Sequence, residues 1–122
     1  MAAELRFIIL TEADFRLAIQ SFRRSHPGFL PDGAVENWTE SENGTLELAL
    51  TVKGGVTTNH VPFKIESHHV VEILVRFCIE NNIPIPRAGR KTWLLKDKGM
   101  GLRINLGEKE VSAAYAELEA LV

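Results

Sequence analysis

The sequence predicts an α+β fold, a largely antiparallel sheet with about three helices packed mainly on one face. Three observations support this. Some segments alternate apolar and polar residues, as strands with one buried face do, others have apolar residues at helical spacing, and turn residues separate them. The elements follow the order β-α-β-β-β-α-β-β-α, for which a ferredoxin-like topology is one candidate. With 122 residues and no repeat or linker, the chain is expected to form a single compact domain over residues 1–122.

The first strand and helix are predicted near the start of the chain. An apolar run over residues 5–10, interrupted only by Arg6, predicts a short buried strand. Thr11 is a suitable helix N-cap, and Asp14 places a negative charge in the first turn, where it favours the helix dipole. The helix is predicted over residues 12–24. Its buried side is expected to consist of Phe15, Ala18, Ile19 and Phe22.

Two of the next three strands have clear patterns. Residues 45–52 alternate between apolar and polar side chains, so one face should be buried and the other should contact water. Asn43-Gly44 just before them suits a tight turn from the preceding strand. Residues 56–66 can return as a further strand. Pro62 within it lacks a backbone donor, which indicates an edge strand or a bulge.

A second helix is predicted from Ser67, as its N-cap, to Asn81 or Asn82. Its broad apolar stripe includes Cys78 and predicts the central helix of the core, in which the thiol is a buried apolar group. A last helix is predicted from Glu108 to about Leu121. Its apolar side would contain Val111, Ala114, Tyr115, Leu118 and Leu121, which can pack on the core or form a homodimer through Tyr115 and Leu118.

Residues 91–97 and 100–106 predict a hairpin whose register decides where Trp93 points. With a two-residue Lys98-Gly99 loop, Trp93 opposes Ile104 and is buried, while Lys96 and Arg103 lie on the other face. With a three-residue loop that adds Asp97, Trp93 opposes Arg103 in an exposed cation–π pair. We favour the first register because it gathers the apolar residues on one face.

The strongest functional signal is a concentration of positive charge within residues 84–103. Six cationic side chains against one carboxylate give this segment a charge of +5, whereas eight against fifteen give −7 elsewhere. Pro84 and Pro86 restrict the chain ahead of these cations, which reduces the entropy lost on binding. The sequence therefore predicts a partner-binding surface that contains Arg87, Arg90, Lys91, Lys96, Lys98 and Arg103.

The favoured function is a non-enzymatic binding or adaptor domain whose basic surface meets an anionic partner such as an acidic protein segment. One alternative is that the same surface binds nucleic acid. Another is a small-molecule enzyme, although no catalytic motif is found. A simpler interpretation is that Lys96, Lys98 and Arg103 only protect an exposed hairpin edge from association.

Other candidate sites have weak support. His68 and Glu72 are four residues apart on a helix, but a third ligand is lacking in the sequence nearby, so no metal site is predicted. The glycine pairs lack the lysine of a phosphate-binding loop, so no cofactor is predicted. Cys78 is the only cysteine, and the apolar run near the start is too short for an export signal or a membrane span. We therefore expect a soluble, cytoplasmic protein.

Overall fold

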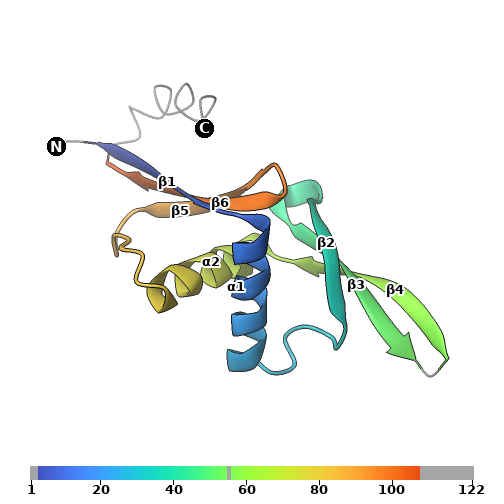
Figure 1. Cartoon of the computed structure of the whole chain (residues 1–122). Coiled ribbons are helices and arrows are strands. Elements are labelled where there is room, and N and C mark those ends of the chain that lie inside the picture. Colours follow the sequence, from blue (N-terminus) through green and yellow to red (C-terminus); the bar gives the residue numbers. More distant parts are fainter. Residues whose placement is uncertain (1–2, 55, 108–122) are drawn as a thin grey trace.

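The computed structural model describes residues 3–54 and 56–107, which form two helices and six strands in two antiparallel sheets (Figure 1). The α+β class is as predicted, and the order of elements agrees up to the sixth strand. The predicted helix from Glu108 to Leu121 lies outside the described residues. The elements are β1 (Glu4–Leu10), α1 (Glu12–Ser25), β2 (Ala34–Glu40), the short 3-10 helix η1 (Glu42–Gly44), β3 (Leu46–Gly54), β4 (Thr57–Ile65), α2 (Ser67–Glu80), β5 (Arg90–Lys96) and β6 (Gly99–Leu106).

The strands form two sheets, so the predicted single sheet and the ferredoxin-like topology are wrong. Sheet A has the order β1-β6-β5, and sheet B has the order β2-β3-β4. Sheet B joins strands that are consecutive in the chain, whereas sheet A depends on pairing between the first and last described strands. Alternation of apolar residues indicates that a strand has a buried face, but it does not indicate which sheet the strand joins.

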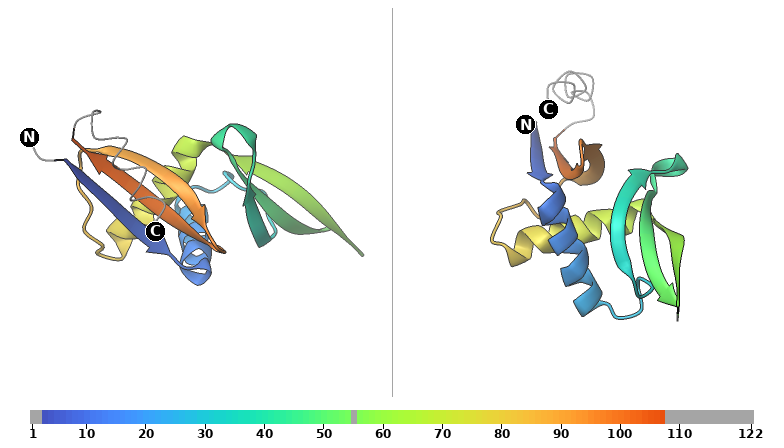
Figure 2. Two further views of the ribbon diagram at one scale, coloured as in Figure 1. Left: turned by 90° about the horizontal axis from the view of Figure 1, so that it is seen from above. Right: turned by 45° about the vertical axis from the view of Figure 1, so that its right-hand side comes forward.

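Both helices lie on one side of sheet A, and sheet B stands beside them (Figures 1 and 2). Side chains from all three parts join one apolar core. Leu10, Met100, Leu102 and Ile104 come from sheet A, Leu46, Leu48, Leu50 and Ile65 from sheet B, and Phe15, Ile19, Val70 and Leu74 from the helices. The expected buried side of α1 is confirmed, and Cys78 is buried as predicted.

Local signals in the sequence explain several element boundaries. Thr11 caps α1 as predicted: its hydroxyl accepts from the Asp14 N–H at 3.1 Å, while the Asp14 carboxylate accepts from the Thr11 N–H at 3.3 Å. Pro62 lies on β4, an edge strand of sheet B, where its missing donor is tolerated. Neither α1 nor α2 is long and apolar enough to span a membrane, and the described chain contains no other helix that would do so.

Candidate functional site

The β5–β6 hairpin fixes the direction of most of the predicted binding residues. Lys96 pairs with Gly99, so Asp97 and Lys98 form the loop and Trp93 opposes Leu102. Neither predicted register therefore gives the residue pairs that are observed across the hairpin. The favoured one nevertheless gives the correct faces, because the observed pairing differs from it by two residues and side chains alternate with a period of two.

The structure gives a physical reason for this loop. Asp97 adopts a φ of 54°, the positive value required at the first position of a tight hairpin loop. Gly99 instead lies within β6, where a Cβ atom would be 2.1 Å from the carbonyl oxygen of Leu10. This glycine therefore serves close packing between β6 and the end of β1.

Trp93 lies on the side of sheet A that faces the helices, and it packs against the core. Its indole Nε1 donates to the hydroxyl of Ser67 at 3.1 Å. The predicted role of Ser67 as N-cap is wrong, because the N-cap position is Glu66 and no side chain caps the helix there. Ser67 thus connects the start of α2 to β5. The cation–π pair between Trp93 and Arg103 is excluded because the two residues lie on opposite faces.

The six predicted binding residues are divided among different parts of the hairpin and its neighbouring loop. Arg90, Lys96 and Arg103 share the face of sheet A that points away from the helices, here called the outer face. Lys91 lies on the opposite face. Arg87 precedes β5 and Lys98 follows it, so they lie at opposite ends of the strand. The six cations that are close together in the sequence therefore do not form one continuous surface on sheet A.

The edge-protection interpretation fits only part of this arrangement. Lys96 lies on β5, which is an edge strand of sheet A. Arg103 lies on β6, the central strand, so it does not protect an edge. Its Nε atom donates to the Thr92 hydroxyl at 2.9 Å, across the outer face.

Arg87 and Lys91 border an apolar groove beside α2. The groove has a volume of about 350 Å³. The side chain of Ile79 is 64 % exposed there. We call this feature the α2 groove. It is lined by Val75, Ile79, Ile85, Pro86, Arg87 and Lys91.

Two sets of hydrogen bonds hold the loop that forms one wall of the α2 groove. The Ile83 N–H donates to the Cys78 carbonyl at 2.8 Å, which fixes the start of the loop to α2. The Lys91 ammonium donates to the carbonyl oxygens of Arg87 at 3.2 Å and of Ala88 at 3.4 Å. The wall of the groove is therefore connected to regular structure at both ends.

A histidine–carboxylate cluster joins the end of α1 to the start of α2. Oxygen atoms of Glu72 lie 3.8 Å from His26 Nε2 and 3.8 Å from His69 Nδ1. His68 instead lies 3.4 Å from Glu66, so the considered pair of His68 with Glu72 is not formed. Within residues 3–54 and 56–107, no group of three His, Cys, Asp or Glu side chains could hold a metal ion. The sequence does not predict the approach of His26 to Glu72, because the two residues are far apart in the chain.

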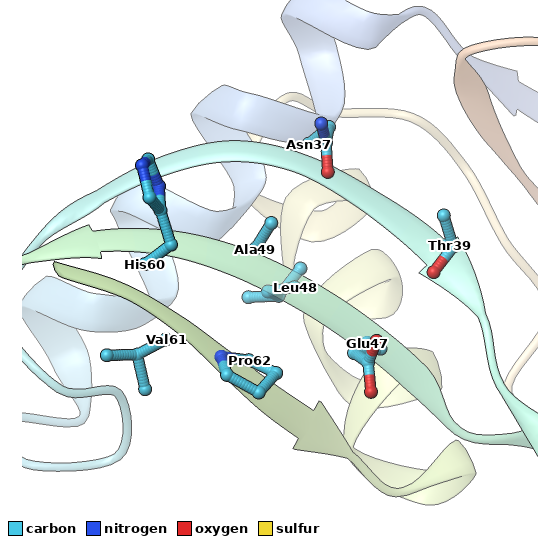
Figure 3. Close-up of a pocket in the computed structure, with 8 residues that line it drawn as sticks. All are labelled: Asn37, Thr39, Glu47, Leu48, Ala49, His60, Val61 and Pro62. Atoms are coloured by element: carbon cyan, nitrogen blue, oxygen red, sulfur yellow. The ribbon is translucent and has the colours of Figure 1, made fainter.

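The exposed face of sheet B contains a shallow depression of about 330 Å³ (Figure 3). Ala49 and Pro62 are directly opposite one another on β3 and β4. Polar side chains of Asn37, Glu47 and His60 surround them (Figure 3). None of the six predicted binding residues lines this depression.

Cys78 does not have the properties of a reactive thiol. Its side chain is buried in the core, and burial raises the pKa of the Cys78 thiol above its usual value. The thiolate, which is the nucleophilic form, is therefore disfavoured.

Comparison of the chain with protein-family models, with curated proteins and with solved structures finds no match. Function is therefore inferred from the geometry and chemistry of the chain itself.

Proposed function

We propose that this chain is a non-enzymatic binding domain that holds an acidic, partly apolar protein segment in the α2 groove. The observation that carries the proposal is the exposed Ile79 in a groove bordered by Arg87 and Lys91. An apolar lining with a few charged groups at its margin is typical of binding sites. Arg87 and Lys91 thus border an apolar recess that is large enough for a side chain of the partner.

The expected affinity is modest. Burial of one leucine-sized side chain contributes roughly 1.5–3 kcal/mol, and each ion pair at an exposed margin contributes about 0.2–1 kcal/mol. Association also costs translational and rotational freedom. The anchored groove wall reduces the further cost of ordering the loop. These contributions total at most about 5 kcal/mol, so we expect a dissociation constant of about 0.2 mM or weaker from these contacts alone.

The division of the cations favours a peptide over nucleic acid. Lys91 points to one side of sheet A, whereas Arg90, Lys96 and Arg103 point to the other, so one nucleic-acid strand would contact only a subset of them. The raised pKa of the Cys78 thiol, caused by burial, argues against an enzyme that uses this cysteine. Nucleic-acid binding remains the alternative outcome of the following test.

Selection from a random peptide library on the immobilised full chain tests the proposal. We expect the selected peptides to be rich in Asp and Glu with at least one large apolar residue, and to bind Ile79→Asp and Arg87→Ala variants at least about threefold more weakly. A Lys53→Ala/Lys64→Ala variant, which removes two exposed cations from sheet B, is the matched control. Selected peptides without acidic residues, or equal binding to the Ile79→Asp variant, would reject the groove as the site.

A parallel titration with mixed-sequence DNA and RNA over a salt series tests the alternative. Phosphate contacts would give an affinity that falls steeply as the salt concentration rises. Such behaviour, lost in an Arg90→Ala/Lys96→Ala variant, would favour nucleic acid and the outer face over the peptide proposal.

A further inference from the structure

The outer face of sheet A is apolar along β1. Leu5, Phe7 and Ile9 alternate onto this face, and Ile9 is 46 % exposed. At the centre of the face, a Cβ atom added to Gly101 would lie 3.2 Å from Leu94 Cγ and 3.6 Å from Ile9 Cδ1. These side chains from the two edge strands thus converge over the glycine and form a continuous apolar row.

Neither α1 nor α2 covers this row, because both helices lie on the other side of sheet A (Figures 1 and 2). An antiparallel sheet with one face in the core normally has a polar second face. The apolar outer face is therefore the kind of surface that another element covers.

Positive charge lies beside the apolar row. Arg90 and Lys96 project onto the outer face from β5, and Arg103 projects from β6. Within residues 3–54 and 56–107, no ion pair involves Arg90 or Lys96. The matching occupant of this face would have an apolar stripe flanked by carboxylates.

The chain carries a segment with these properties immediately after β6. Residues 108–121 contain four glutamates and one lysine, a charge of −3, together with the apolar stripe of the predicted last helix. On a helical projection the glutamates flank this stripe on both sides. They are Glu108, Glu110, Glu117 and Glu119.

The position and length of this segment also fit. Gly107 has a φ of 120°, a conformation that favours glycine and allows the chain to change direction where β6 ends. A helix of fourteen residues is about 21 Å long. This is close to the length of a seven-residue strand, about 24 Å. A segment that reverses at Gly107 would therefore run back along the sheet beside the strand it has just left.

We infer that residues 108–121 form a helix that packs on the outer face of sheet A of the same molecule. Val111, Tyr115 and Leu118 cover the apolar row, and glutamates on one flank approach the β5 cations. This surface is distinct from the α2 groove, and the inference does not depend on the proposed function. In this arrangement Arg90 and Lys96 contact another segment of the same chain rather than a separate partner.

A spin label tests this inference in the full chain. Ala116 lies on the predicted helix opposite the apolar stripe, so an Ala116→Cys variant can carry a nitroxide without disturbing the contact. Cys78 is buried and should not take the label. We expect amide NMR signals of residues 5–9 and 101–105 to lose at least half of their intensity, while signals of residues 46–50 in sheet B do not.

Two further measurements complete the test. In the spin-labelled Ala116→Cys chain, a second substitution Leu118→Glu should restore the signal intensity of residues 5–9 and 101–105. Lys109→Glu, on the opposite side of the predicted helix, should leave the intensity loss unchanged. The signals of sheet B report whether each variant is folded. In a mixture of isotope-labelled chain and spin-labelled unenriched chain, intensity loss in sheet A would mean that a second copy covers the face, and the inference would be overturned. Equal intensity in sheets A and B of the labelled chain would overturn it as well.

Discussion

Replacing Gly99 by alanine tests the close contact between β6 and the end of β1. The added Cβ would lie 2.1 Å from the Leu10 carbonyl oxygen, whereas ordinary contact begins at 3.4 Å, so the backbones must separate by about 1.3 Å. The atom in the way belongs to the backbone, so no change of side-chain conformation can relieve the clash. Overpacking costs 1–3 kcal/mol, and we expect Gly99→Ala to lower the free energy of unfolding by about 3 kcal/mol.

Urea unfolding followed by circular dichroism measures this loss, and thermal unfolding should show a fall in Tm of about 12 °C. Gly54→Ala is the matched control, since its Cβ would meet only the Asn59 amide nitrogen at 3.8 Å. It should be neutral or stabilise by less than about 1 kcal/mol. Gly101→Ala should fall between the two, because it displaces only the side chain of Leu94. If the free energies of unfolding of Gly99→Ala and Gly54→Ala differ by less than about 0.5 kcal/mol, the close contact between β6 and Leu10 is refuted.

Three further substitutions probe contacts of named side chains. Arg16→Lys should cost about 1–2 kcal/mol in urea unfolding, because the guanidinium donates to two β2 carbonyl oxygens at 2.5 and 2.6 Å; an unchanged midpoint would contradict this. Ser67→Ala should cost about 1 kcal/mol by leaving the Trp93 indole N–H without its acceptor, and Ser67→Thr should retain most of the stability. Burial raises the pKa of the Cys78 thiol, so the unfolded chain loses its thiol proton at a lower pH than the folded chain does. The wild type should therefore lose stability relative to Cys78→Ala as the pH rises above 9.0, and parallel stability curves would refute this.

Local patterns in the sequence predicted the elements well but not their assembly. The Thr11 cap, the alternation in β3 and the edge position of Pro62 depend on a few neighbouring residues, and all three are confirmed. The pairing of β1 with β6 joins distant segments, and no local pattern specifies it. Glycine is common in turns, so the sequence predicts that Gly99 lies in the loop. Its actual role depends on Leu10, almost ninety positions away.

The candidate site shows the same limit. The sequence shows how densely the cations follow one another along the chain, whereas strand geometry separates neighbours such as Arg90 and Lys91 onto opposite faces. Each face combines its cations with apolar side chains, in the α2 groove on one side and in the β1 row on the other. The proposed packing of residues 108–121 would involve the cations of the outer face but not those of the α2 groove. We therefore infer that the chain neutralises the cations of that face itself, and that Arg87 and Lys91 are the ones that meet a separate partner.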